Sequence, residues 1–210
     1  MVADRGGHRG LFYELGKRKD IVVAGDIGCY TLGFAPPYNA MDFVVCMGAS
    51  LSSAHGCQKV LNMVDGNEKR VVGVLGDSTF FHTGINSLID VIYNKGNSIS
   101  IILDNRITGM TGHQQNPTTG KNLRGEPAGK VDLEALCRAL GFNRVRVVDP
   151  YDLKAVEVAV TEELAAKEPS IIISRRPCVM IKGTVHKPPI SVDESKCVGC
   201  KQCMSIGCPA

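Results

Sequence analysis

Two pairs of small polar residues, Gly76-Asp77 and Asp104-Asn105, each follow a short apolar run of this 210-residue chain. Ligands of parallel α/β sheets bind beyond the carboxyl ends of the strands, so we expect Asp77 and Asn105 to meet above one edge of a sheet. A carboxylate, an amide oxygen and a backbone carbonyl, here that of Ile107, are suitable ligands for Mg²⁺. Because Mg²⁺ usually completes its coordination shell with phosphate oxygens and water, the sequence predicts a site for a magnesium-bound phosphate group.

The residues around the first pair favour the same chemistry. Gly76 permits a close approach of the backbone, and the hydroxyl groups of Ser78 and Thr79 can donate hydrogen bonds to phosphate. A helix expected to begin near Gly84 would direct its first N–H groups toward an anion. Either pair alone is most often only a turn, so a non-catalytic role stays open. The order of strand, Gly-Asp-Ser, helix, strand and Asp-Asn is more specific.

A second candidate site lies near the C-terminus, where the stretch CVGCKQCMSIGCP carries Cys197, Cys200, Cys203 and Cys208. The two-residue spacings between the first three cysteines are typical of ferredoxin motifs that hold a [4Fe–4S] cluster. The gap before Cys208 is four residues, which departs from the commoner three. A zinc site is the alternative, although zinc ribbons usually use two separated cysteine pairs. The spacing therefore favours an iron–sulfur cluster over zinc.

The composition excludes several classes of function. The chain has 24 Lys and Arg residues against 21 Asp and Glu, and its longest basic run is 17–19, so no nucleic-acid partner is expected. No stretch reaches the roughly 18 to 20 apolar residues of a membrane span, and the N-terminus has no signal-peptide core. We therefore expect a cytoplasmic protein without a membrane partner. Nine cysteines with one dense cluster indicate metal ligation in a reducing compartment.

Short β-branched runs alternate with amphipathic stretches along most of the chain. Strands are expected at 21–24, 43–46, 71–75, 99–103, 145–148 and 171–174, and helices at 11–19, 50–62, 85–94, 133–140 and 153–167. The strands are apolar on both faces, which predicts an α/β fold whose parallel sheet is covered by helices on both faces. One domain is expected at 1–185, followed at 186–210 by a linker and the cysteine motif. The polar stretch 108–130 has the length of a binding loop.

The stretch from Gly76 to Asn105 resembles the thiamine diphosphate (TPP) motif, which runs Gly-Asp-Gly, helix, strand and Asn, with Ser78 here in place of the last Gly. The following ITGMTGHQQNPTTG resembles the matching loop of the 2-oxoacid:ferredoxin oxidoreductases. Comparable blocks are His8-Arg9-Gly10, Asp26-Ile27-Gly28-Cys29, and Met47 through Gly56. The resemblance covers nearly the whole chain, and it points to the carboxyl-terminal part of a large subunit with the TPP-binding fold.

The resemblance implies a role for each matching residue. Asp77, Asn105 and the carbonyl of Ile107 would bind Mg²⁺. The contacts on the diphosphate side would be Gly76, Ser78, Thr79, Thr111 and Gly112. The candidates for lining the thiazolium ring or the substrate are Cys29, His55, His82 and Gln114. The cysteine motif would supply Cys197, Cys200, Cys203 and Cys208 to a [4Fe–4S] cluster.

The implied reaction is oxidative decarboxylation of a 2-oxoacid, such as the aryl-pyruvate indolepyruvate, to acyl-coenzyme A, with electrons passing through iron–sulfur clusters to ferredoxin. The implied partners are a preceding pyrimidine-binding part of the same subunit, which would supply the activating Glu, and a smaller beta subunit. We expect the 210-residue chain alone to be inactive. A non-oxidative TPP-dependent decarboxylase and a non-catalytic scaffold are the alternatives. A Rossmann-type nucleotide site is disfavoured, because no Gly-x-Gly-x-x-Gly follows the first strand.

Overall fold

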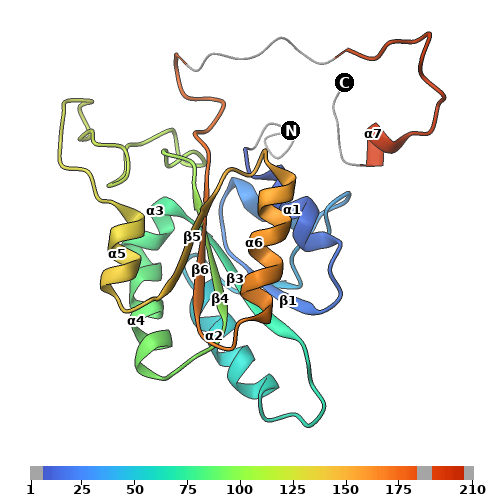
Figure 1. The fold of residues 1–210 in the computed structure, drawn as a ribbon. Coiled ribbons are helices and arrows are strands. Elements are labelled where there is room, and N and C mark those ends of the chain that lie inside the picture. The colour runs from blue at the N-terminus through green and yellow to red at the C-terminus, as the bar shows by residue number, and fades with distance from the viewer. Residues whose placement is uncertain (1–6, 184–190, 206–210) are drawn as a thin grey trace.

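The computed structural model describes residues 7–183 and 191–205. Within 7–183, six strands form one sheet in which all neighbouring pairs are parallel, in the order β2-β1-β3-β4-β6-β5 (Figure 1). The strands are β1 (Ile21–Gly25), β2 (Phe43–Val44), β3 (Arg70–Gly76), β4 (Ile99–Asp104), β5 (Arg144–Val148) and β6 (Ser170–Arg175). The predicted α/β fold with a parallel sheet is therefore confirmed.

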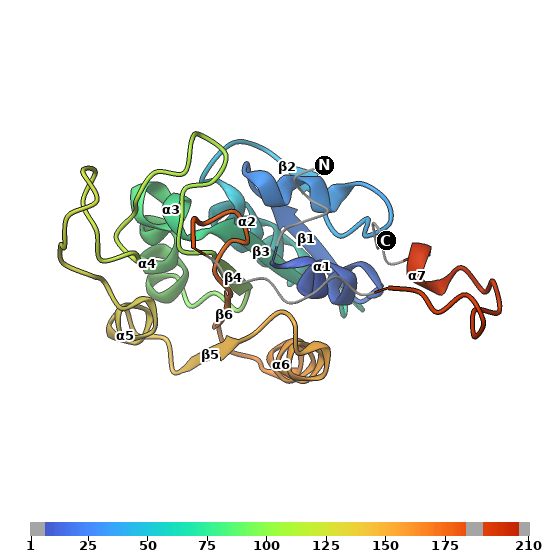
Figure 2. The same cartoon turned by 90° about the horizontal axis from the view of Figure 1, so that it is seen from above.

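Helices cover both faces of the sheet, as predicted (Figure 2). One layer consists of α1 (Arg9–Gly16) and α6 (Leu153–Ala165), and the other of α2 (Ser50–Leu61), α4 (Ile85–Tyr93) and α5 (Leu133–Ala139). Successive strand residues point to opposite layers because a strand has a period of two. Val74 accordingly packs in the α1/α6 layer, whereas its neighbour Leu75 packs against residues of α2, α4 and α5.

Helix α4 begins at Ile85, as the predicted helix 85–94 requires, but it continues a longer helical run. Three consecutive segments run from the end of β3: α3 (Asp77–Thr79), the π-helical turn η3 (Phe80–Gly84) and α4. The expectation that the first free N–H groups lie near Gly84 was therefore wrong. Gly84 leaves room for a buried side chain inside this helical run, because a Cβ atom there would lie 2.4 Å from Leu75 Cδ1. The first N–H groups of the run consequently belong to residues next to Asp77.

The edge strand, the segment after β1 and the long loop have irregular forms. The strand expected at 43–46 ends at Val44, since β2 lies at the edge of the sheet and pairs with β1 at only two positions, Phe43 and Val44. A short 3₁₀ helix, η2 (Cys29–Phe34), follows β1. The long loop 108–130 contains two isolated antiparallel bridges, Thr108 with Gln114 and Lys121 with Pro127.

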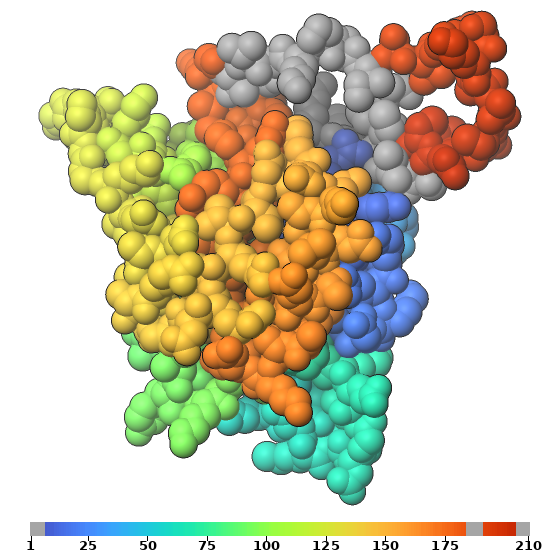
Figure 3. Space-filling view, viewed as in Figure 1, coloured from blue at the N-terminus to red at the C-terminus, as the bar shows by residue number. Residues whose placement is uncertain are grey.

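The described part of the cysteine-rich tail, 191–205, includes the one-turn helix α7 (Gln202–Ser205). It projects away from the α/β body, and its residues 191–204 are exposed (Figure 3). The division into a domain at 1–185 and a tail at 186–210 stays a prediction. None of the helices in the described residues combines the length and the apolar character that crossing a membrane requires.

Candidate functional site

The two predicted polar pairs lie at the carboxyl ends of adjacent strands. Gly76 of β3 is in register with Leu103 of β4, so Asp77 and Asn105 follow neighbouring strand ends. Asp77 Oδ2 accepts a hydrogen bond from the backbone N–H of Arg106 at 3.0 Å, and Asn105 Oδ1 accepts one from the N–H of Ile107, also at 3.0 Å. The structure thus brings Asp77 together with the turn that contains Asn105 and Ile107.

The Asp77 carboxylate is buried, with only 2% of the residue exposed. Burial, and to a smaller extent the nearby charge of Asp104, raises the pKa of Asp77 from 3.8 to about 6. Hydrogen bonds from the N–H groups of Ser78, at 2.8 Å to Oδ1, and Arg106 oppose this shift. A divalent cation would favour the ionised carboxylate, and carboxylate and amide oxygens are hard-cation ligands. The residues present therefore fit Mg²⁺.

The predicted diphosphate contacts lie around this carboxylate. Ser78 and Thr79 begin the helical run that follows Gly76, with Thr79 buried and Ser78 half-buried. Thr111 and Gly112 lie in a closed turn of the long loop, where Gln114 Nε2 donates to the Thr111 carbonyl at 2.6 Å. Gly112 has φ +121°, a conformation that favours glycine. Thr111 and Gly112 are exposed in the chain as described.

Sequence reasoning did not assign Thr118, although it singled out the Pro-Thr-Thr stretch that contains it. The Thr118 hydroxyl lies 2.6 Å from Asn116 Oδ1 and 3.4 Å from Asp77 Oδ2, and both Thr118 and Asn116 are buried. The hydroxyl proton can serve only one of these acceptors at a time. Thr118 therefore anchors the long loop against Asp77.

Tyr30 was also not assigned from the sequence. Its hydroxyl accepts a hydrogen bond from the Gly76 N–H at 2.9 Å and lies 3.2 Å from the Ile27 carbonyl, to which it donates. A Cβ atom on Gly76 would lie 3.0 Å from the Tyr30 ring. Tyr30 thus fixes the end of β3 against the segment that follows β1, and it explains why a glycine precedes Asp77.

Asp26, at the end of β1, holds the start of α2. Its carboxylate is fully buried and accepts hydrogen bonds from the N–H of Gly48, at 2.8 Å and 2.9 Å, and from the N–H of Ser50 at 3.1 Å. Gly48 has φ +88°, and a Cβ atom there would lie 2.4 Å from Thr83 Cγ2 of the π-helical turn. Gly48 therefore packs α2 against the segment that begins at Asp77.

The four candidates for the thiazolium or substrate side do not lie together. Cys29 begins η2, and its Sγ would be 3.8 Å from a Cβ atom on Gly109 of the long loop. Burial raises the pKa of the Cys29 thiol. His82 is exposed on the π-helical turn, with Nδ1 2.6 Å from Thr83 Oγ1. Gln114 is held by Thr111, as described above. These three surround the carboxyl edge of the sheet.

His55 lies elsewhere. It is buried in α2, and a Cβ atom on Gly96, which precedes the amino end of β4, would lie 2.5 Å from His55 Nδ1. The structure therefore does not bring His55 to the edge that carries Asp77. Its burial, which lowers its pKa, is explained by packing between α2 and the segment before β4.

Cys197, Cys200 and Cys203 are exposed, and no disulfide forms among the described cysteines. Within 7–183 and 191–205, no three His, Cys, Asp or Glu side chains are grouped so that they could hold a metal ion. Cys208 lies outside the described residues. The described tail thus does not present a formed cluster site, and the [4Fe–4S] cluster stays a prediction from the cysteine spacing.

Residues 26–174, which contain the whole edge described above, match the family described as thiamine pyrophosphate enzyme, C-terminal TPP binding domain. The chain belongs to this family. The match runs from Asp26, which follows β1, to Ser174 in β6, so it includes every residue described above at the carboxyl edge.

The chain is similar, over 97% of its length, to curated proteins named indolepyruvate oxidoreductase subunit IorA. The identity is 39% over 220 residues for the protein of Pyrococcus horikoshii and 37% over 212 residues for that of Methanothermobacter marburgensis. The chain spans 34% and 33% of the length of these relatives, or about a third.

Solved structures support the fold. The 2-oxoglutarate:ferredoxin oxidoreductase from Magnetococcus marinus has a TM-score of 0.66 at 17% identity, covering 81% of this chain and 61% of that one. The benzoylformate decarboxylase from Polynucleobacter necessarius has a TM-score of 0.59 at 18% identity, covering 79% of this chain and 32% of the other. At these identities the likeness concerns the TPP-binding fold alone.

Proposed function

We propose that this TPP-binding domain holds the Mg²⁺-diphosphate end of TPP in a 2-oxoacid:ferredoxin oxidoreductase that acts on an aryl-pyruvate, with indolepyruvate as the favoured substrate. The observation that carries the proposal is the buried Asp77 carboxylate, bonded to the Arg106 N–H that directly follows Asn105. This bond joins the two strand ends at which a shared cation would be held.

In this proposal, the chain contributes binding and orientation. Asp77, Asn105 and the carbonyl of Ile107 hold Mg²⁺, while Gly76, Ser78, Thr79, Thr111 and Gly112 contact the diphosphate. When bound, TPP supplies the nucleophilic carbon and the electron sink for decarboxylation of a 2-oxoacid. Cys29, His82 and Gln114 face the thiazolium or substrate side. His55 is not included, because it packs against Gly96.

The oxidative version of the reaction is favoured by the similarity to IorA proteins over 97% of the chain and by the cysteine spacing of the tail. The proposed tail ligands are Cys197, Cys200, Cys203 and Cys208 around a [4Fe–4S] cluster. The proposed partners are a pyrimidine-binding part of the same subunit that supplies the activating Glu, a beta subunit, ferredoxin and coenzyme A. The proposed compartment is the cytoplasm, where thiols stay reduced.

Calorimetric titration with TPP and Mg²⁺ tests the binding proposal. We expect Asp77→Asn, which is nearly isosteric, to lower the affinity at least about 100-fold, since it removes a metal ligand. Asp65→Asn is the matched control, because Asp65 is exposed outside the site. Equal affinities for wild type and Asp77→Asn would instead support a non-catalytic scaffold.

A second measurement separates oxidative from non-oxidative chemistry. Protein purified without oxygen should contain iron and acid-labile sulfide if the tail holds a cluster, and replacing Cys200 with Ser should lower both. A non-oxidative decarboxylase needs no such cluster. Stoichiometric zinc without sulfide would reject the iron–sulfur assignment.

A further inference from the structure

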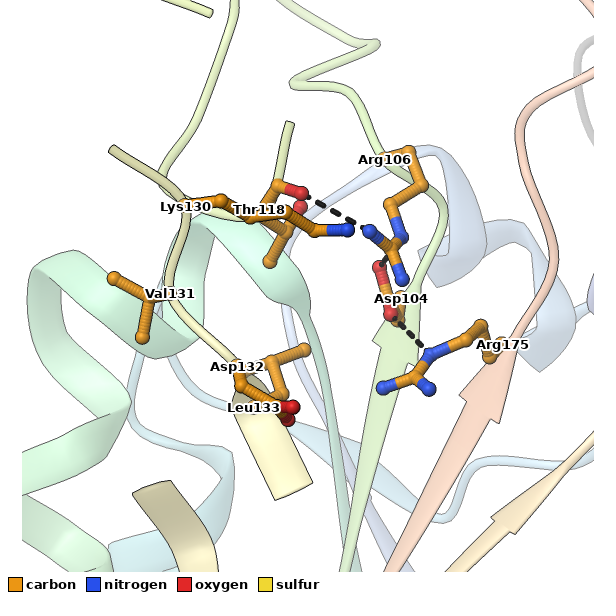
Figure 4. A pocket seen from close by; sticks show the side chains of 8 residues that line it. All are labelled: Asp104, Arg106, Thr118, Lys130, Val131, Asp132, Leu133 and Arg175. Atoms are coloured by element: carbon orange, nitrogen blue, oxygen red, sulfur yellow. Dashed lines mark hydrogen bonds and ion pairs between the residues drawn. The ribbon is translucent and has the colours of Figure 1, made fainter. Parts of the chain in front are cut away.

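A small cavity of about 210 Å³ lies beyond the carboxyl ends of β4 and β6 (Figure 4). Thr118 lines this cavity, and its hydroxyl is 3.4 Å from Asp77 Oδ2. Asp77 and Asn105 do not line it. The cavity therefore borders the proposed Mg²⁺-diphosphate site but is formed by different side chains.

A buried carboxylate at the floor of the cavity orients two guanidinium groups. Asp104, which is fully buried, pairs through Oδ1 with Arg106 Nε at 3.0 Å and through Oδ2 with Arg175 Nε at 2.8 Å. Arg106 Nη1 donates to the Thr118 carbonyl at 3.0 Å. Among the described residues, the Nη groups of Arg175 and Arg106 Nη2 donate to no acceptor. Both arginines thus keep N–H donors available for a ligand.

A third cation completes the lining. Lys130 extends into the cavity toward the Arg106 guanidinium, and in the described part of the chain its ammonium forms no ion pair or hydrogen bond (Figure 4). The second carboxylate of the lining, Asp132, is used at the start of α5, where it accepts from the N–H of Glu134 at 2.9 Å and of Ala135 at 3.2 Å. The lining therefore holds three cations and two carboxylates: Asp104 pairs with both arginines, while Asp132 interacts electrostatically with Arg175 and Lys130 without a direct ion pair, so one positive charge is left in excess.

Like charges that point toward one another repel, and an anion placed between them replaces this repulsion with attraction. Guanidinium groups match the oxygens of carboxylates and phosphates through paired N–H donors. We propose that the cavity binds a second anion, a phosphate or carboxylate group, between Arg106, Lys130 and Arg175. The volume is below the roughly 300 Å³ of ordinary ligand pockets, so the group is a small anion or the end of a larger ligand.

The test is a titration of the full chain with inorganic phosphate and, separately, with succinate, at constant ionic strength because exposed charges are screened by salt. Calorimetry gives the affinity, and amide NMR shifts locate the binding. We expect Lys130→Gln to weaken binding about tenfold, as for loss of one charge-assisted hydrogen bond. Lys121→Gln is the matched control, since Lys121 is an exposed lysine of the same loop that does not line the cavity.

Saturating Mg²⁺-TPP distinguishes this cavity from the diphosphate site. Phosphate or succinate should still bind in its presence and still depend on Lys130. Binding of phosphate alone assigns a phosphoryl ligand, and binding of succinate alone assigns a carboxylate. The proposal is overturned if neither anion binds, if Lys130→Gln and wild type have equal affinities, or if Mg²⁺-TPP displaces the anion. Anion binding without any TPP binding would reject the proposed function and leave this proposal intact.

Discussion

The Asp77 carboxylate at the end of β3 accepts a hydrogen bond from the backbone N–H of Arg106 beyond β4, with 3.0 Å between Oδ2 and N. The bond ties together two turns that are 29 residues apart in the sequence. Its acceptor is a buried acid whose ionisation is opposed by burial and by Asp104. Burial brings the proposed metal ligands together and also raises the pKa of Asp77. Cation binding at this site should therefore depend on pH.

Mg²⁺-TPP binding should weaken as the pH falls through about 6, the pKa of Asp77, because a metal ligand must be deprotonated. Below that pH, we expect a loss of about tenfold per pH unit. The terminal phosphate of the cofactor also titrates near pH 6. The quantity to measure is therefore the ratio of wild-type to Asp77→Asn affinity between about pH 5 and 8. A ratio that does not change would contradict the assignment of Asp77.

Replacing Tyr30 with Phe should destabilise the fold by about 1–3 kcal/mol, because the N–H of Gly76 loses its acceptor in a partly buried position. Urea unfolding followed by circular dichroism measures the free energy. Tyr93→Phe provides the comparison, since Tyr93 is 82% exposed on α4. Similar values for the two variants would mean that the Tyr30 hydroxyl does not hold the end of β3.

Gly48→Ala should be more destabilising than Gly66→Ala by about 1–3 kcal/mol. Both glycines have positive φ, +88° and +74°, so the two variants share the backbone strain. Only at Gly48 does the new methyl group collide with a neighbour, Thr83, in the way that overpacking of a core does. Thermal or urea unfolding of both variants gives the difference.

Adding Thr83→Gly to Gly48→Ala removes both colliding atoms, Cγ2 at 2.4 Å and Cβ at 2.6 Å, so the double variant should be more stable than the sum of the two single effects predicts. Additive single effects would show that the cost at Gly48 comes from the backbone and its bonds to Asp26.

His8 should make the fold less stable in acid. The ring is buried against Ser174, with 2.9 Å between Nδ1 and Oγ, and burial lowers its pKa from 6.5 to about 4. Since the unfolded chain takes up this proton first, the free energy of unfolding falls as the pH drops from 6.5 to 4, by roughly 3 kcal/mol in total. His8→Asn should remove this component from urea unfolding curves recorded across that range.

His113→Asn, at an exposed histidine, is the control. Asp77 has the opposite effect on the free energy of unfolding. Because its pKa is raised in the fold, this free energy increases as the pH falls from about 6 to 3.8. Asp77 is present in both wild type and His8→Asn, so the difference between their free energies of unfolding reports the histidine alone. A difference that is constant with pH would show that His8 does not resist protonation in the fold.

Most of the sheet could be predicted because its strands are buried on both faces and therefore read as continuous β-branched runs. The runs that became β4 and β6 were located within one or two residues at each end. The length of the edge strand β2 was overestimated. The apolar run 43–46 predicts four strand residues, but only Phe43 and Val44 pair with β1. The start of α4 at Ile85 was predicted, but the helical segments 77–79 and 80–84 before it were not, since they carry no apolar periodicity of their own.

The candidate site was predictable where its residues are adjacent in sequence to strand ends, as for Asp77 and Asn105. Thr118 and Tyr30 act through contacts 41 and 46 residues away, and no local periodicity reports such contacts. Arg175 meets Asp104 only because β6 lies beside β4 in the sheet, an order that the sequence did not specify. His55 was assigned to the site because it belongs to the family-like segment from Met47 to Gly56. Its place in the second turn of α2 takes it away from the carboxyl edge of the sheet.

The sheet order has a consequence for how the cofactor could enter and leave. β3 and β4 are the two innermost strands, so their amides should exchange hydrogen with solvent only when most of the domain opens. The backbone bonds of the loop 108–130 join residues of the loop itself or of its immediate flank, not the sheet, so the loop should open at a lower free energy. A ligand can therefore enter or leave by local opening of this loop. Asp77 meanwhile stays at the end of β3, one of the strands whose amides should exchange most slowly.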